Sequence, residues 1–378
     1  MSRAHSGQAS GNARAVAANL LDRIERDGAY ANLVLASAEL PERDAGLITE
    51  LVYGATRMRR ALDHLIDGFV SEPPDLNTRN LLRIGAYQLH MMATPAYAAV
   101  SETVAAAPRR LRGFVNAVLR RVADMTPAWP TDAIRLSYPD WMVERLEHDL
   151  GHGEARAALE QMNRPGGASA RSDGYIQDQA SQWVAELVGA QPHERVLDMC
   201  AGPGGKATAL AGRPTTVVAA DHRRHRASLV AANAVRTGAN LAGVVVADGR
   251  HPPFRPGTFD RVLVDAPCSG LGVLGRRADA RWRVAPDDVE ELARLQAELV
   301  RSAFSLVRPG GVVVYSVCTL TAAETSEIDQ LVAREHPDAV AVPIGGPRWR
   351  SHARGGLVLP QDHNTDGMFV VIYKTPDS

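Results

Sequence analysis

Residues 195–206 read RVLDMCAGPGGK, an apolar run rich in strand-forming residues that ends in a glycine-rich turn. This pattern predicts a buried strand, a tight turn and then a helix that begins near Lys206. Glycines at 202, 204 and 205 let the main chain approach a ligand closely, and the first turn of the helix offers unpaired N–H groups. The spacing fits neither a P-loop nor a G-x-G-x-x-G dinucleotide motif. Residues 200–206 are therefore a candidate cofactor loop of another kind.

The next two predicted strands each end in an acid. VVAADH (217–222) ends at Asp221, and the strand after it ends in ADG (247–249), which contains Asp248. A carboxylate at the first of these positions can accept both hydroxyls of a ribose, and one at the second could reach an adenine amino group. Each acid alone could be an ordinary turn residue. Together with the loop they predict a nucleoside cofactor that needs no phosphate, and S-adenosylmethionine is the candidate.

From residue 176 onward, strand-like and helix-like segments alternate. The candidate strands are apolar runs rather than strict alternations, which favours strands buried on both faces and hence a mostly parallel α/β sheet. They are RVLDMC, TTVVAADH, AGVVVAD, FDRVLVDAP, GGVVVYSVC and GMFVVIYK. Ligands bind beyond the carboxyl ends of such strands, and all three cysteines, Cys200, Cys268 and Cys318, fall there.

The first third of the chain has a different pattern. Over residues 12–125 apolar side chains recur every three or four positions, as in ARAVAANLLDRIERDG (13–28), so we predict an all-α domain of five to seven helices. A joint rich in Pro, Gly and Ser follows, with one helix near 141–151. The predicted domains are 1–126 (all-α), 127–175 (linker) and 176–378 (α/β).

Composition excludes some classes of protein. Lys and Arg total 42 against 43 Asp and Glu, a net charge of −1, so the overall charge carries no nucleic-acid signal. No apolar run is long enough for a membrane helix, the first residues do not resemble a signal peptide, and three cysteines do not suggest a disulfide framework. The histidines show no ligand spacing with one another or with the cysteines. We expect a cytoplasmic monomer without a metal site.

The local distribution of charge is more informative about RNA binding than the net charge. APRRLRGFVNAVLRR (107–121) concentrates arginines in a predicted helix and its entry, and these are Arg109, Arg110, Arg112, Arg120 and Arg121. Such a segment is either an RNA-binding face or a solvated helical face, and its sequence alone does not separate the two.

Two cysteines near an acid at neighbouring strand ends suit methylation of cytosine at C5. That carbon is too weak a nucleophile to attack a sulfonium methyl group until a thiolate adds to C6. A contact to N3 stabilises the charge that develops, and the C5 proton must later be removed before the thiol leaves. Asp265, Cys268 and Cys318 could supply these functions. A strand-end cysteine is otherwise a small buried apolar residue, and spacing does not tell which of the two would be the nucleophile.

The chain resembles a known family at these residues. LDMCAGPGGK, DAPCSGLG and YSVCTLTAAETSE resemble the signatures of the Sun/Fmu (NOL/NOP/Sun) RNA cytosine-C5 methyltransferases. LRIGAYQL, AAVSETV and FVNAVLRR resemble the NusB-like RNA-binding domain of the bacterial ribosomal, RsmB-type members. The resemblance implies a class I (Rossmann-like) methyltransferase domain with a seven-stranded, mostly parallel sheet, preceded by an all-α NusB-like domain. It also implies S-adenosylmethionine as cofactor and small-subunit (16S) rRNA as substrate.

The resemblance also implies roles for single residues. Cys318 would be the nucleophile, Cys268 would assist release of the methylated RNA, and Asp265 would contact the base and the methionine end of the cofactor. The family's cofactor loop falls on Cys200, Ala201, Gly202, Pro203, Gly204, Gly205 and Lys206. Its ribose-binding acid falls on Asp221, its adenine-side acid on Asp248, and Cys200 has a structural place in the loop.

Two departures from the family pattern leave alternatives open. The chain has VCT where the family has TCS, and only NRPGGASARSDGYIQDQASQW (163–183) remains of a longer RNA-binding segment. One alternative is a member redirected to another RNA or to a small-molecule substrate. Another is an RNA-binding module with a degenerate catalytic domain, although the intact loop, Asp265 and both cysteines argue against it.

Overall fold

The computed structural model describes residues 12–164, 167, 169–212 and 214–377, and they form two compact units. Unit 1 contains the described residues up to Asp140 together with Arg277–Arg283. Unit 2 contains the described residues of Trp141–Arg276 and of Val284 to the C-terminus. The predicted linker, 127–175, is thus divided between the two units, and a short segment from within the predicted α/β half belongs to the helical unit.

Unit 1 is all-helical, as its periodicity predicts. Helix α5 packs against α1, α3, α4, α6 and α7, and alanine, leucine, isoleucine and valine side chains fill the space between them. The helices are α1 (Ala13–Arg26), α2 (Ala31–Ala36), α3 (Ala45–Arg57), α4 (Arg59–Asp67), α5 (Leu76–His90), α6 (Ala96–Ala106), α7 (Arg112–Asp124) and α8 (Asp132–Leu136), with the short 3₁₀ helices η1 (Arg109–Leu111) and η2 (Ala278–Trp282).

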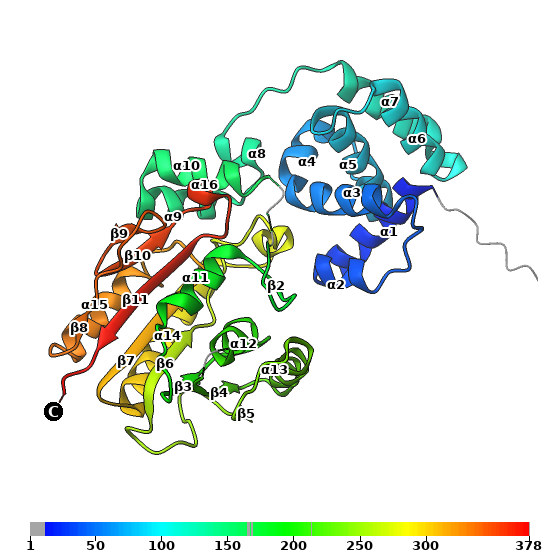
Figure 1. The fold of residues 1–378 in the computed structure, drawn as a ribbon. Coiled ribbons are helices and arrows are strands. Elements are labelled where there is room, and N and C mark those ends of the chain that lie inside the picture. The colour runs from blue at the N-terminus through cyan, green and yellow to red at the C-terminus, as the bar shows by residue number, and fades with distance from the viewer. Residues whose placement is uncertain (1–11, 165–166, 168, 213, 378) are drawn as a thin grey trace, which may run out of the picture. The chain divides into compact units, whose positions relative to one another are not determined.

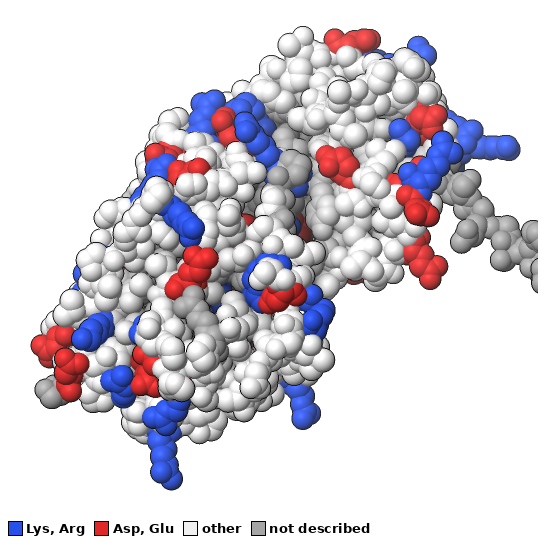
Figure 2. All heavy atoms as spheres, in the orientation of Figure 1, with Lys and Arg blue, Asp and Glu red and all other residues white. Residues whose placement is uncertain are grey.

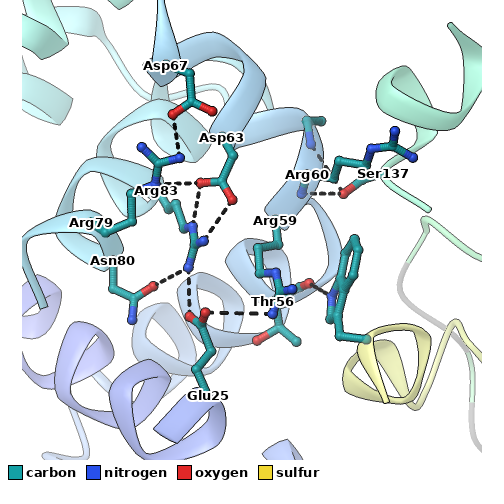
Figure 3. A network of polar contacts seen from close by, with 12 residues as sticks. Glu25, Thr56, Arg59, Arg60, Asp63, Asp67, Arg79, Asn80, Arg83 and Ser137 are labelled. Carbon is teal, nitrogen blue, oxygen red and sulfur yellow. Dashed lines mark hydrogen bonds and ion pairs between the residues drawn. The ribbon is translucent and has the colours of Figure 1, made fainter. Parts of the chain in front are cut away.

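A buried ion-pair network also holds unit 1 together (Figure 3). Asp63 on α4 accepts hydrogen bonds from Arg79 and Arg83 on α5, at 2.9 and 2.7 Å from their Nε atoms. Arg83 also donates to Glu25 of α1 at 2.7 Å, and its side chain is only 8% exposed. These arginines therefore stabilise the helical unit and are not available to a ligand at its surface.

The segment Arg277–Arg283 joins unit 1 through side chains that sequence pattern does not reveal. The guanidinium of Arg281 is fully buried, lies 3.9 Å from the ring centre of Tyr138, and donates to the main-chain oxygens of Arg57 and Ser137. The indole N–H of Trp282 donates to a further carbonyl of α3 at 2.7 Å. Hydrogen bonds from these side chains to main-chain carbonyls in the last turn of α3 explain why this segment packs with the helices.

Unit 2 is built on a nine-stranded sheet in the order β5-β4-β3-β6-β7-β11-β10-β9, with β8 paired to β11 (Figure 1). Strands β3 to β7 are parallel, whereas β11 runs antiparallel to β7. The strands are β3 (Arg195–Asp198), β4 (Thr216–Asp221), β5 (Gly243–Val246), β6 (Phe259–Asp265), β7 (Val307–Val317), β8 (Val340–Ala341), β9 (Arg350–His352), β10 (Gly355–Val358) and β11 (Met368–Lys374).

The predicted fold class, a mostly parallel α/β sheet preceded by a helical domain, is confirmed. All six strands predicted from apolar runs are present, as β3, β4, β5, β6, β7 and β11. The sheet has nine strands instead of the expected seven, because the short β9 and β8 pair with β10 and β11. These additions lie on the antiparallel side of the sheet, away from the parallel strand ends.

Helices cover the sheet of unit 2, and a small hairpin precedes it. Helix α13 packs on β4 and β5, α14 on β6 and β7, and α11 on α12 and β11. The helices are α9 (Asp140–Leu150), α10 (His152–Gln161), α11 (Gln179–Leu187), α12 (Gly205–Ala211), α13 (Arg224–Thr237), α14 (Pro286–Leu306), α15 (Ser326–Glu335) and α16 (Pro360–His363). The hairpin is β1 (Ser169–Ala170) with β2 (Ile176–Gln177).

Candidate functional site

The five parallel strands bring the predicted site residues to one edge of the sheet. Asp221 and Asp265 are the last residues of β4 and β6, and Asp248 follows β5 after one intervening residue. In the register of β6 with β7, Asp265 lies opposite Ser316, so Cys318 follows just beyond that pair. Parallel strands end on the same side, which is why residues far apart in sequence converge here.

The glycine-rich loop has the predicted strand–turn–helix form between β3 and α12. Gly204 has a φ of +112°, a left-handed conformation that glycine adopts without strain. The main-chain N–H of Gly202 donates to Oδ2 of Asp221 at 3.0 Å, and a Cβ on Gly202 would lie 2.5 Å from that oxygen. The loop and the carboxylate of β4 are therefore packed directly against each other.

Asp221 also contacts a cation. Its Oδ2 lies 3.2 Å from Nε of Arg226 on α13, and its Oδ1 accepts from the main-chain N–H of Arg223 at 2.9 Å. The side chain of Asp221 is 6% exposed. These contacts fix the carboxylate of Asp221 at the end of β4. It is therefore oriented to bind a ligand held by the glycine-rich loop.

Lys206 at the start of α12 forms an ion pair with Asp265. Its Nζ lies 2.7 Å from Oδ2 of Asp265, and the other carboxylate oxygen accepts from the hydroxyl of Ser316 at 2.8 Å. Burial lowers the pKa of Lys206, but the charge and hydrogen bond of Asp265 outweigh it and raise that pKa overall. Lys206 is therefore a fixed positive charge beside the end of β6.

Asp198 is a further candidate site residue, which the sequence did not single out. It is the last residue of β3, it is 1% exposed, and both of its carboxylate oxygens lack a hydrogen-bond partner among the described residues. Burial, and next the charge of Asp265, raise its pKa to about 7, although Lys206 opposes them. Its position as the last acid before the glycine-rich turn was the available signal. A buried, unpaired carboxyl group suits a cationic ligand group.

Asp248 has a different side-chain partner from Asp198, Asp221 and Asp265. Arg250 donates to both of its carboxylate oxygens, at 3.0 and 2.7 Å. Those hydrogen bonds, made by the side chain and by the main chain of Arg250, lower the pKa of Asp248 to about 2. The structure thus puts Asp248 at the predicted strand end, but as the partner of an exposed arginine.

The two cysteines of the later motifs meet. The Sγ atoms of Cys268 and Cys318 lie 3.2 Å apart, within hydrogen-bonding range for sulfur, and neither is in a disulfide. The hydrogen bond to Cys318 and burial raise the pKa of Cys268 well above its ordinary value. Burial and nearby carboxylates, Asp198 first, do the same for Cys200 in the loop. Two of the three cysteines are thus in direct contact.

Within residues 163–183, the structure forms the β1–β2 hairpin, which contacts the start of α12. Arg171 between its strands donates to the carbonyl of Gly205 and to Oγ1 of Thr208 at 2.9 Å, both on α12. The guanidinium groups of Arg171 and Arg236 lie 4.8 and 5.0 Å from the centre of the Tyr175 ring. The hairpin therefore braces the start of α12, which carries Lys206.

The five predicted RNA-binding arginines are all exposed on unit 1. Arg112 donates to the carbonyls of Ala105 and Ala107 and so caps the end of α6. The other four form no ion pair with any residue that the structure describes. On the face shown in Figure 2, basic and acidic side chains are interspersed.

Comparison with known proteins decides the family. The protein-family model described as 16S rRNA methyltransferase RsmB/F matches residues 185–374 of this sequence. The family model for the NusB family matches residues 11–124. The chain belongs to the RsmB/F family. The resemblance expected from the loop and the two cysteine motifs is thereby confirmed, and so is the NusB-like character of the helical region.

Relatives match almost the whole chain. Ribosomal RNA small subunit methyltransferase B of Thermus thermophilus is 35% identical, over 95% of this chain and 97% of its own. A probable enzyme of that name from Bacillus subtilis is 30% identical, over 94% and 97%. A putative methyltransferase of Mycobacterium tuberculosis is 36% identical over 438 aligned positions, more than the 378 residues of this chain. That alignment therefore contains positions without a counterpart here.

Solved structures agree with the fold. The structure of PH0851 superimposes with a TM-score of 0.77 at 21% identity, over 96% of this chain and 98% of that one. A methyltransferase homologue from Pyrococcus horikoshii has a TM-score of 0.55 at 20% identity, over 66% and 100%. Among the described residues, no helix is long and apolar enough to cross a membrane, and no cluster of His, Cys, Asp and Glu could hold a metal ion.

Proposed function

We propose that this methyltransferase transfers a methyl group from S-adenosylmethionine to C5 of a cytosine in small-subunit (16S) rRNA. The observation that carries the proposal is the pair of thiols, Cys268 and Cys318, which are in contact at 3.2 Å just beyond the carboxyl ends of β6, which ends in Asp265, and of β7. Methyl transfer to C5 of a pyrimidine requires a thiolate that first adds to C6.

The residues at the strand ends fit S-adenosylmethionine, which supplies the methyl group. The unpaired, buried carboxyl group of Asp198 suits the positive charge of its amino-acid end. Asp221 is fixed beside the main chain of Gly202, where a carboxylate can accept ribose hydroxyls. Asp248, at the end of the next strand, would contact the adenine by exchanging its arginine partner for the base.

Cys318 is the proposed nucleophile. Its sulfur adds to C6 of the cytosine, a C–S bond forms, and the electron pair displaced from the C5–C6 double bond makes C5 nucleophilic. Asp265 lies close enough to both the loop and the cysteines to contact N3 of the base, and Lys206 keeps it in place. After methyl transfer the C5 proton is lost, the C–S bond breaks and the electron pair returns to the sulfur. Cys268 would assist that last step.

Ribosomal RNA is the proposed substrate, because the relatives that match this chain over nearly its whole length are named small-subunit rRNA methyltransferases. We propose that the exposed arginines of η1 and α7 contact this RNA and that the enzyme acts as a cytoplasmic monomer. A redirected member that acts on another RNA or on a small molecule is not favoured, since the NusB-family region and the methyltransferase region are both retained.

Bisulfite sequencing of 16S rRNA, from cells with and without the gene, tests the proposal. One or more 5-methylcytosines should disappear with the gene and return when the wild-type protein is supplied. The protein with Cys318→Ala should not restore them. An unchanged set of 5-methylcytosines, or a methyl group that mass spectrometry of nucleosides places on another atom, would contradict it.

A further inference from the structure

Glu324, which precedes α15, is a carboxylate buried between the loops that carry the two thiols. It is 0% exposed. Its Oε1 accepts from the main-chain N–H of Ser269 at 2.8 Å and from Nε2 of Gln296 at 3.0 Å. Its Oε2 accepts from the hydroxyls of Ser269, of Thr319 at 3.1 Å and of Thr321 at 2.9 Å. Five donor groups therefore point at this one carboxylate, and both of its oxygens have hydrogen-bond partners.

Two of these donor residues are the immediate neighbours of the cysteines. Ser269 directly follows Cys268, and Thr319 directly follows Cys318. The hydroxyls of Ser269 and Thr319 also lie 2.8 Å from each other. One carboxylate therefore ties both cysteine loops together next to the two sulfur atoms.

Side chains of α14 and β7 also donate hydrogen bonds to Glu324. Gln296 of α14 donates to the carbonyl of Pro267 at 2.8 Å as well as to Glu324. The buried hydroxyl of Tyr315 on β7 lies 3.0 Å from Oε1 of Gln296 and 2.7 Å from the carbonyl oxygen of Glu324. Because each group has a partner, the network resists rearrangement.

The two thiols have different charged groups nearby. Cys318 is near two cations, Lys206 and Arg276. Burial lowers the pKa of each cation, but their carboxylate partners outweigh burial, and the charge of Cys318 adds to the rise. Positive charge near a sulfur favours its thiolate form.

Cys268 instead faces acids. Besides Glu324, the acids Asp288 and Glu291 of α14 line a hollow of about 330 Å³ together with Cys268. No cation among the described residues forms an ion pair with Glu324. The hydrogen bond to Cys318, then burial and the charges of Cys318 and Glu324, raise the pKa of the Cys268 thiol. Negative charge near a sulfur favours its protonated form.

We propose that Glu324 is a positioning residue that holds the Cys268 and Cys318 loops in contact and keeps Cys268 protonated while Cys318 is the thiolate. This inference rests on the proposed cytosine-C5 chemistry for its purpose. The charge separation itself is a property of the protein without substrate. It explains in physical terms why two adjacent thiols take different roles.

The protonated Cys268 would then assist release of the methylated base. When the C6–S bond to the methylated base breaks, the electron pair returns to Cys318 and the C5 proton passes to water. The S–H of Cys268 is in place to donate a hydrogen bond to the departing thiolate. If Cys268 also ionised, two negative sulfurs at this distance would repel each other and slow release.

Alkylation by iodoacetamide as a function of pH, read out peptide by peptide with mass spectrometry, tests the charge separation without RNA or cofactor. In the wild type, Cys318 should react at lower pH than Cys268. Glu324→Gln keeps the shape of the side chain and removes its charge, so the midpoint for Cys268 should fall by about one pH unit. The matched control is Glu327→Gln on α15, an exposed position, which should leave both midpoints unchanged.

A second variant tests the positioning role. Ser269→Ala removes the hydroxyl that contacts both Glu324 and Thr319 but keeps the main-chain donor, so the fold should survive. The covalent RNA adduct should then last about fivefold longer than in the wild type, which is the effect of one lost hydrogen bond. This variant decides the question if Glu324→Gln does not fold.

Two results would overturn the inference: a Cys268 midpoint in folded Glu324→Gln that equals the wild type, or an adduct lifetime in Ser269→Ala that equals the wild type. Alkylation needs no substrate. A protein that does not methylate rRNA would contradict the proposed function and leave the alkylation result standing. A protein that methylates rRNA without the midpoint shift would contradict only the role of Glu324.

Discussion

The sulfur atoms of Cys268 and Cys318 lie 3.2 Å apart although fifty positions separate the two residues in the chain. Strands β6 and β7 are neighbours and parallel, so the turns after them start side by side. This contact places two thiols side by side, as the proposed cytosine chemistry requires, and it leads to the first prediction.

Cys318→Ala should abolish both methylation and the covalent adduct with RNA, because no sulfur is left to add to C6. Cys268→Ala should form the adduct and accumulate it, because only release is impaired. Denaturing gel electrophoresis of the protein with radiolabelled rRNA measures the adduct. If Cys268→Ala lost the adduct while Cys318→Ala kept it, the two roles would be reversed.

Lys206→Met should weaken cofactor binding and lower the free energy of unfolding by about 2 kcal/mol, the value of a hydrogen bond between charged groups. The reason is that Asp265 loses its partner at 2.7 Å. The chain has one other lysine, Lys374, whose side chain is 52% exposed, so Lys374→Met is the matched control. Urea unfolding and calorimetric titration with S-adenosylmethionine measure the two effects. Equal losses in both variants would contradict the special role of Lys206.

Asp198→Asn should stabilise the cofactor-free protein at alkaline pH. The folded pKa of Asp198 is raised to about 7 from an ordinary value near 4. Between these values the unfolded carboxyl group is ionised while the folded one keeps its proton, so wild-type stability falls as pH rises from about 4 to about 7. The gain from Asn should grow over that window, to at most about 4 kcal/mol, and stay constant above it.

Thermal unfolding from pH 4.5 to pH 8 measures this gain. Asp248→Asn is the contrasting variant, because the pKa of Asp248 is lowered to about 2 and its stabilising effect is lost only as pH falls through that value. It should show no gain at alkaline pH. A pH-independent difference between Asp198→Asn and the wild type would rule out a buried carboxyl group with a raised pKa.

Arg120→Ala combined with Arg121→Ala should weaken RNA binding and reduce the slope of log affinity against log salt by about 1 to 2, since each phosphate contact contributes about 0.7 to 0.9. These two are chosen over Arg112, whose guanidinium caps α6 and whose loss would also perturb the helix end. Arg156→Ala, an exposed arginine paired with Glu160, is the control. An unchanged slope would leave these arginines as a solvated helical face.

Arg83→Met should lower the free energy of unfolding by about 3 kcal/mol, because it leaves Asp63 and Glu25 without their buried cation. Circular dichroism during urea unfolding measures the loss. Arg120→Met, the same change at an exposed position of unit 1, should stay within about 0.5 kcal/mol of the wild type. Similar losses in both would contradict the structural role of the network.

Much of the fold could be predicted from the sequence, because it depends on local pattern. Apolar runs placed all six predicted strands, and the glycines at 202, 204 and 205 placed the turn and the start of α12. Parallel strands share one end, so the convergence of Asp221, Asp265, Cys268 and Cys318 followed from their positions at strand tips.

The partners of these residues depended on the tertiary structure. Nothing in the sequence distinguishes Arg83, buried in an ion-pair network, from Arg120, exposed on α7, since both lie in amphipathic helices. Likewise the segment Arg277–Arg283 looks like part of the α/β half, yet its buried Arg281 belongs to the helical unit.

By itself, the sequence determined the six predicted strands and the end of the sheet at which Asp265 and the two cysteines lie, because hydrophobic periodicity and glycine content act over a few residues. Only the tertiary structure decided that no described residue donates a hydrogen bond to the carboxylate of Asp198, that Lys206 pairs with Asp265 and that Glu324 joins the two cysteine loops. Burial, hydrogen bonding and charge at those positions come from groups on other strands and helices. The charge state of each thiol is therefore a property of the folded site and not of its motif.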